Sequence, residues 1–157
     1  MKISKLLIVV AFAIIQFVPS NIVWADSYMV VVCEAGSWSG HRIGWQPFGS
    51  SKRDDGSNSI SFKEYVFIVP LSSEKKLERI FVRYGGEKDY TASVRYTYMD
   101  DDGQGYMIAE AQPYDILETI IIDIPSYNVV IQNVKKMLGG LSVDVFAKSC
   151  TGDVVKN

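Results

Sequence analysis

The sequence has few of the residues on which most enzyme and metal sites depend. Its 157 residues include a single histidine, His41, and only two cysteines, Cys33 and Cys150. These are too few for a tetrahedral metal site without carboxylates, so we expect no metal and no cofactor. The chain also lacks a Gly-x-Ser-x-Gly turn, a His-Glu-x-x-His pattern and a glycine-rich phosphate loop. We therefore predict that the protein is not an enzyme.

Positive charge is not in surplus either. Sixteen Lys and Arg stand against eighteen Asp and Glu, which gives a net charge of −2 at pH 7. Binding to a nucleic-acid backbone depends on Lys and Arg that neutralise phosphates, so no nucleic-acid partner is expected. Hydrophobic residues make up 48% of the chain and charged residues 22%, which excludes wholesale disorder. The length suits one domain.

The longest apolar run lies at the N-terminus. Lys2 and Lys5 precede and flank ten apolar residues at positions 6–15, and Val23 and Ala25 place small residues before position 26. This three-part order is typical of a secretory signal peptide, and the run is too short to cross about 30 Å of hydrocarbon. We predict a removed signal at residues 1–25, a secreted or periplasmic location and no membrane anchor in the mature chain.

The two cysteines stand near the two ends of the predicted mature chain. In an oxidising compartment such a pair favours a disulfide, so we predict a bridge between Cys33 and Cys150. Two buried free thiols are the alternative.

Short alternating segments, separated by Gly, Pro and polar turns, predict antiparallel strands throughout residues 26–150. The alternation places Val94, Tyr96 and Tyr98 on one face, and it points Leu141, Val143, Val145 and Ala147 inward. Seven to nine such strands predict an all-β fold, an antiparallel β-sandwich with one disulfide. Residues 151–157 are expected to form a loose C-terminal tail.

One segment is ambiguous. Residues 127–138 carry apolar side chains at helical spacing between Ser126 and Gly139, yet they are rich in β-branched residues. We interpret this segment as a strand, with a helix, and so an α+β fold, as the alternative.

The aromatic residues of a long irregular segment at 34–58 form the candidate binding site. Exposed aromatic faces beside polar groups suit sugar or peptide recognition, whereas the same rings as part of the core would be structural. Trp38 is flanked by Gly and Ser and is expected to be accessible, whereas Trp45 is expected to be buried beside Ile43. The candidate ligand-binding residues are Trp38, His41, Arg42, Trp45 and Phe48.

Carboxylates offer two weaker candidates. Asp100, Asp101 and Asp102 are interpreted as a solvated hairpin tip, although three adjacent carboxylates also attract calcium. A glycoside hydrolase would need two acids facing each other across a cleft, and the strand residues Glu64, Glu110 and Glu118 could supply them.

The sequence thus predicts an exported, non-enzymatic protein that binds carbohydrate or another protein. The alternatives are a structural or assembly subunit that joins partners through sheet edges, and a weak hydrolase built around His41. The oligomeric state stays open.

Overall fold

The structure of the chain is a computed structural model that describes residues 25–45, 53–54, 59–72, 76–86, 88–137 and 140–156. The predicted signal at 1–25 therefore lies outside the described residues, apart from Ala25. The described residues form one short 3-10 helix, η1 (Pro113–Asp115), and twelve strands: β1 (Ser27–Cys33), β2 (Gly36–Trp45), β3 (Arg53–Asp54), β4 (Ser59–Phe62), β5 (Tyr65–Leu71), β6 (Arg79–Tyr84), β7 (Lys88–Met99), β8 (Gly105–Ala111), β9 (Ile116–Ile124), β10 (Asn128–Met137), β11 (Gly140–Ser149) and β12 (Thr151–Lys156).

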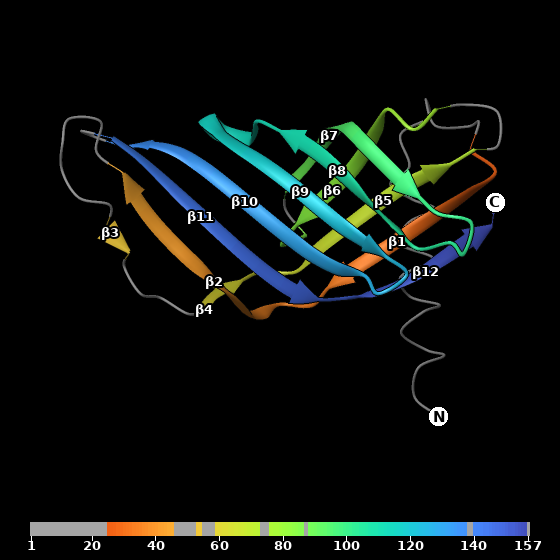
Figure 1. The fold of residues 1–157 in the computed structure, drawn as a ribbon, viewed down its shortest axis with the longest axis horizontal. Helices are drawn as coiled ribbons and strands as arrows, with labels where there is room; N and C mark the ends of the chain where they lie inside the picture. The colour runs from red at the N-terminus through yellow and green to blue at the C-terminus, as the bar shows by residue number, and fades with distance from the viewer. Residues whose placement is uncertain are drawn as a thin grey trace.

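All twelve strands belong to one antiparallel sheet that curls on itself (Figure 1). The strand order is β12-β1-β5-β6-β7-β8-β9-β10-β11-β2-β3, and β4 pairs with β2. β1 pairs with β12 near one end of the sheet, and β2 pairs with β11 near the other end. Because β1 leads into β2 and β11 leads into β12, both ends of the sheet are built from the same two parts of the chain. The predicted antiparallel all-β class is confirmed. The continuous pairing leaves one curled sheet in place of the expected sandwich of seven to nine strands.

The ambiguous segment forms a strand over residues 128–137. β10 pairs along nearly its whole length with β9 on one side and β11 on the other. Val129 and Ile131 are fully buried, as β-branched side chains on a central strand are expected to be. Backbone pairing on both edges and this alternation exclude the helical alternative.

The expected loose tail at 151–157 is also a strand over most of its length. β12 pairs with β1 from Thr151 opposite Val32 to Lys156 opposite Ser27. The tail prediction was wrong because polarity alone marked the segment, whereas β1 presents a free edge whose backbone groups need partners. Val155 in addition packs beside Tyr28 and Val30 on the outer face.

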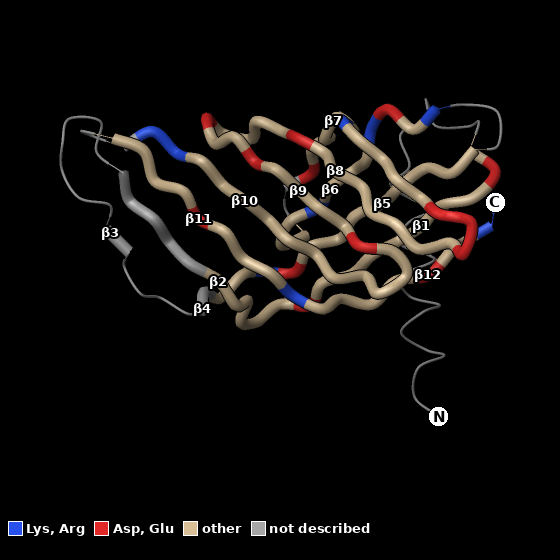
Figure 2. The backbone as a smooth tube through the Cα atoms, in the orientation of Figure 1, with Lys and Arg blue, Asp and Glu red and all other residues tan. Residues whose placement is uncertain are grey.

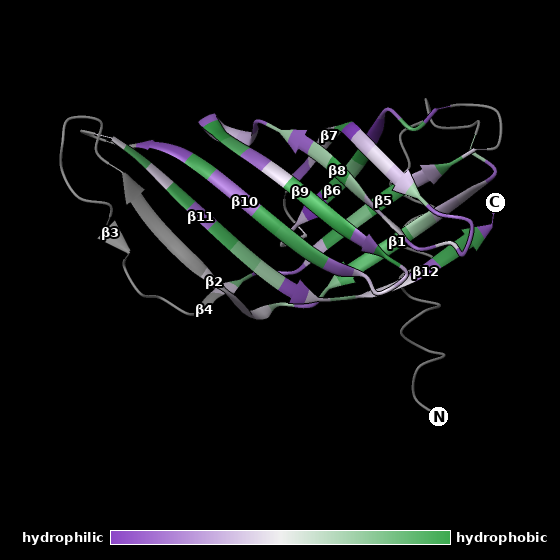
Figure 3. Ribbon diagram, in the orientation of Figure 1, coloured by the Kyte–Doolittle hydropathy of each residue, from purple (hydrophilic) through white to green (hydrophobic). Residues whose placement is uncertain are grey.

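The core lies inside the curl of the sheet. Alternate residues of each strand point inward. The middle strands β9 and β10 carry long green, hydrophobic stretches in Figure 3. On β9, Ile120 and Ile122 are fully buried, whereas Ile121 between them faces outward and is half-buried. Fully buried side chains from the other strands complete this core: Val31, Phe67, Ile80, Val82, Ala109, Val129, Ile131 and Phe146.

The inward face of β11 is the opposite of the one predicted. Ser142, Asp144 and Phe146 are buried, whereas Leu141 is exposed. Asp144 lies opposite Asn133 on β10, so two polar side chains share one cross-strand position of the inner face. The prediction failed because it assumed that the interior is apolar along the whole strand, and here the buried row combines Ser142 and Asp144 with Phe146.

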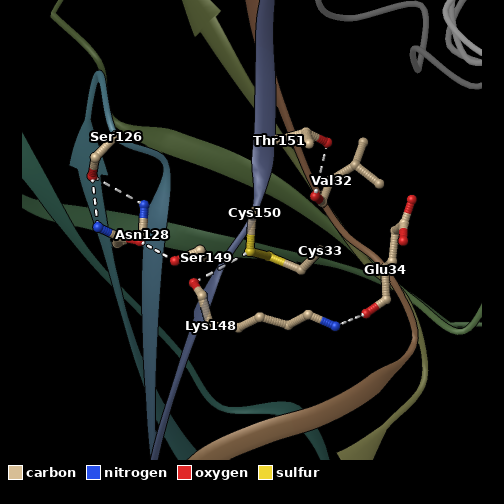
Figure 4. The surroundings of a disulfide bond; sticks show 9 residues. All are labelled: Val32, Cys33, Glu34, Ser126, Asn128, Lys148, Ser149, Cys150 and Thr151. Atoms are coloured by element: carbon tan, nitrogen blue, oxygen red, sulfur yellow. Dashed lines mark hydrogen bonds between the residues drawn. A yellow bond between two sulfur atoms is a disulfide. The ribbon is translucent and has the colours of Figure 1, made fainter. Parts of the chain in front are cut away.

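The predicted disulfide between Cys33 and Cys150 is present, at the corner where β1 meets β2 and β11 meets β12 (Figure 4). The two Cα atoms are 4.6 Å apart, and 117 positions separate the residues in the chain. Thr151 Oγ1 donates a hydrogen bond to the Val32 carbonyl at 3.3 Å. The bridge thus ties the first strand to the last segment of the chain.

Candidate functional site

The Trp38 side chain is part of the core, so the expectation of an accessible ring was wrong. Its exposed fraction is 0%. The ring meets Phe62 edge-on with centroids 5.4 Å apart, and it lies 5.6 Å from the Tyr65 ring. Gly and Ser neighbours suggested mobility, but β2 is a regular strand here, paired with β4, and it directs Trp38 inward.

The other predicted binding residues are only partly placed. His41, Arg42 and Trp45 belong to β2, and their backbones pair with Val145, Asp144 and Leu141 of β11. Their side chains, and the whole of Phe48, lie outside the described residues. The segment predicted to be an aromatic loop is thus largely a strand. The expectation that the Trp45 side chain is buried beside Ile43 stays a prediction.

Three exposed tyrosines on β7 and β8 form a cluster that the sequence analysis did not identify as a site. Tyr98 lies directly opposite Tyr106, and Tyr96 lies diagonally across from it. The Tyr106 centroid is 5.8 Å from Tyr96 and 5.9 Å from Tyr98, with interplanar angles of 33° and 35°. Exposed fractions are 50% for Tyr96, 48% for Tyr98 and 39% for Tyr106. The three rings therefore make one continuous, accessible aromatic surface.

A β-bulge turns these tyrosines outward. The β7–β8 register shifts between Val94 and Tyr96. Val94 pairs with the fully buried Ala109, but Tyr96 pairs with Ile108 on the opposite face. An extra residue in one strand reverses which side chains face the core. The prediction that Tyr96 and Tyr98 share the face of Val94 was therefore wrong.

Aliphatic side chains extend this surface across the neighbouring strands. Tyr96 lies opposite Ile108, Ile108 opposite Ile121, and Ile121 opposite Val130. Residues directly opposite each other in a sheet share a face, and these three aliphatic residues are half-buried. We call the outward surface made of these side chains the tyrosine face: Tyr96, Tyr98, Tyr106, Ile108, Ile121 and Val130.

Carboxylates border the tyrosine face at one end. The turn from 100 to 104 between β7 and β8 carries Asp100, Asp101 and Asp102, which colour it red in Figure 2, and all three are exposed. Asp100 Oδ1 accepts hydrogen bonds from the backbone N–H of Asp102 at 3.1 Å and of Gln104 at 2.8 Å. This confirms a hairpin turn. Asp123, also exposed, lies opposite Tyr106 on β9.

A buried carboxylate, that of Glu118, lies inside the curled sheet. Glu118 is 3% exposed, and the Tyr90 and Tyr65 hydroxyls donate hydrogen bonds to its carboxylate. Burial raises the pKa of Glu118 above its ordinary value, and the two hydrogen bonds oppose this shift. Burial and the nearby carboxylate also raise the pKa of both tyrosines, so they stay hydrogen-bond donors at neutral pH.

The three glutamates considered for a hydrolase do not come together. Glu118 faces the interior, whereas Glu110 is on the outward face of β8 and binds Arg95 Nε at 2.8 Å. Glu64 is exposed in the segment just before β5. No pair of these carboxylates flanks a common cleft, and within the described ranges no group of three His, Cys, Asp or Glu is placed to hold a metal ion.

Comparison with protein-family models, with curated proteins and with solved structures finds no match to this chain. In the part of the chain that the structure describes, no helix is long and apolar enough to cross a membrane.

Proposed function

We propose that this chain is an exported binding protein that holds a protein partner on the tyrosine face. The observation that carries the proposal is the set of three large aromatic side chains, each 39–50% exposed, clustered on one outward surface. Contiguous exposed apolar surface on a soluble domain marks an interaction site. Tyrosine in particular is enriched at the centres of protein interfaces.

The export part of the proposal rests on two features. The signal-like segment at 1–25 is a sequence feature, and the Cys33–Cys150 bridge is a structural one. Disulfides persist in oxidising compartments and are rare in the reducing cytosol, so the bridge supports a periplasmic or extracellular location.

Carbohydrate is the second candidate ligand, because of the geometry of the rings. The Tyr106 ring lies 5.8 Å from the Tyr96 ring and 5.9 Å from the Tyr98 ring, so neighbouring exposed rings offer aromatic faces on which the apolar face of a sugar can stack. The aliphatic extension through Ile108 and Ile121 favours a protein, because a sugar chain gains little from a broad aliphatic surface.

The two alternative roles have less support. The edge strand β12 has six residues and carries Asp153 and Lys156, and short charged edges discourage strand-to-strand assembly. A glycoside hydrolase would need two acids that face each other, and of the three glutamates considered only Glu118 faces the interior.

The test compares retention of partners by wild-type and altered protein. Mature protein is immobilised and exposed to the organism's own exported proteins, with Tyr96→Ala/Tyr106→Ala as the test variant. Tyr114→Ala is the control, because Tyr114 is 72% exposed but lies on η1, away from the face. We expect a partner that wild type and control retain and the double variant loses, while all three unfold at similar temperatures. Equal retention by all three proteins contradicts the proposal.

A further inference from the structure

Carboxylates border the tyrosine face at one end, and no described Lys or Arg forms an ion pair with them. Asp100, Asp101 and Asp102 follow directly after the Tyr98–Met99 end of β7, and Asp123 stands opposite Tyr106. Among the described residues, no ion pair involves any of these four carboxylates. A surface of this kind has aromatic rings in its centre and uncompensated negative charge at one end.

The basic residue nearest to this surface in the sequence is already paired with a carboxylate. Arg95 belongs to the bulge beside Tyr96, and its Nε lies 2.8 Å from Glu110 Oε2. Its charge is therefore offset locally by Glu110. The carboxylates at the Tyr98–Tyr106 end of the tyrosine face thus present a negative field to a partner that approaches this end.

From this arrangement we propose that the partner seats a basic peptide segment, one bearing several Lys or Arg, on the tyrosine face. This inference rests on the proposed function and specifies its partner. Cations are attracted to the faces of tyrosine rings, and guanidinium groups stack on them. The stems of Lys and Arg cover aliphatic side chains such as Ile108 and Ile121, while the charged ends reach Asp100, Asp102 and Asp123.

Charge complementarity separates this partner from other occupants. An anionic lipid surface or a nucleic acid meets four repelling carboxylates at the border of the face. A neutral sugar chain stacks on the tyrosines but makes no use of the charge. A calcium ion is disfavoured because Asp100 Oδ1 already accepts two backbone hydrogen bonds of its own turn.

The experiment measures binding of fluorescein-labelled octa-arginine to mature protein by anisotropy, at an ionic strength of about 0.15 M, where exposed charges act over roughly 8 Å. One variant, Asp100→Asn/Asp102→Asn, removes charge from the border. A second, Tyr96→Ala/Tyr106→Ala, removes two rings. The control, Glu34→Gln/Glu64→Gln, removes the same charge from exposed positions next to the Cys33–Tyr65 pair of β1 and β5, which β6 separates from β7.

We expect the Kd to rise about tenfold or more in each of the first two variants, and less than about twofold in the control, because localised contacts dominate a specific site. An equal rise in the control shows diffuse attraction and overturns the inference. An unchanged Kd in the tyrosine variant, or no binding to wild type, also overturns it.

The outcome is separable from that of the partner-retention test. If the tyrosine variant loses its natural partner but octa-arginine does not bind wild type, the protein-binding face stands and the basic class of partner is wrong. If the variant keeps every partner, the proposed function itself falls, whatever the peptide does.

Discussion

Trp38 stabilises the fold at the scale of a single side chain. Its ring is fully buried against Phe62 and Tyr65. We expect Trp38→Ala to lower the free energy of unfolding by about 3–5 kcal/mol, through lost burial and the cavity left behind. Urea titration followed by circular dichroism measures this, with Tyr114→Ala as an exposed control. A loss below that of the control would place Trp38 outside the core.

Glu118 makes the stability depend on pH in a defined direction. Burial raises its pKa in the folded protein above the ordinary 4.5. The folded state therefore holds this proton more tightly than the unfolded state, so the stability associated with it is complete below pH 4.5 and is lost as the pH rises through the folded pKa. Tyr90 and Tyr65 limit the shift by donating to the charged form.

The Glu118→Gln variant tests this assignment. Gln is neutral at every pH and still offers an acceptor to the Tyr90 hydroxyl. We expect the unfolding free energy of wild type, minus that of the variant, to fall as the pH rises above 4.5. Denaturant titrations across that range give the difference directly. A difference that rises with pH would mean that the folded protein favours the charged carboxylate.

At the scale of elements, β12 completes the sheet. It covers the free edge of β1, and Val155 packs beside Tyr28 and Val30. Deleting residues 151–157 keeps Cys150 and its bridge but exposes that edge. We expect a loss of about 2 kcal/mol or more, since several net hydrogen bonds of about 1 kcal/mol each disappear.

Two measurements check the role of β12. Thermal unfolding gives the stability, and light scattering detects association through the newly exposed β1 edge. A control that lacks only Asn157 should behave like wild type. An unchanged melting temperature in the longer deletion would support the loose tail that the sequence suggested.

Strand positions were predictable from the sequence because alternation with period two is a local signal. The strand at 140–149 was recognisable in this way, whereas the strand at 128–137 was recognisable from its β-branched residues. Which face points inward was less predictable. One extra residue between Val94 and Tyr96 reverses the face, and no residue type marks the bulge. This reversal hid the tyrosine face, although the tyrosines themselves were plain in the sequence.

On β11 the failure has a different cause. Aliphatic residues alternate with Ser142, Asp144 and Phe146, and hydrophobicity alone chooses the aliphatic set as the buried one. The true choice depends on Lys135 of β10, whose Nζ lies 3.7 Å from Asp144 Oδ2, and on Asn133 and Glu118, which lie in the same buried row. A buried polar row becomes acceptable only when neighbouring strands supply polar partners, and that knowledge requires the register.

For the whole molecule, both ends of the curled sheet depend on pairing between residues that are 96 to 129 positions apart in the chain. β1 pairs with β12 and β2 with β11, at opposite ends of the chain. Such long-range pairing leaves no local trace in the sequence, which is why a two-layer sandwich was the natural expectation. The curl separates an inward core from an outward tyrosine face on the same strands.

The disulfide holds these distant segments together at the corner of the sheet. It closes a loop of 117 residues, and removing a bridge of this kind typically costs about 2–5 kcal/mol because the unfolded chain regains freedom. We expect the Cys33→Ala/Cys150→Ala variant to melt roughly 10 °C lower than wild type. Replacing both residues avoids a reactive single thiol.

Reduction provides the matched control for that shift. Dithiothreitol should lower the melting temperature of wild type by a similar amount and leave the double variant unchanged, because only wild type has a bond to reduce. Thiol titration of denatured, unreduced wild type should find no reactive thiol. Two reactive thiols there, or a wild type insensitive to reductant, would show that the bridge does not form and would also remove the structural support for export.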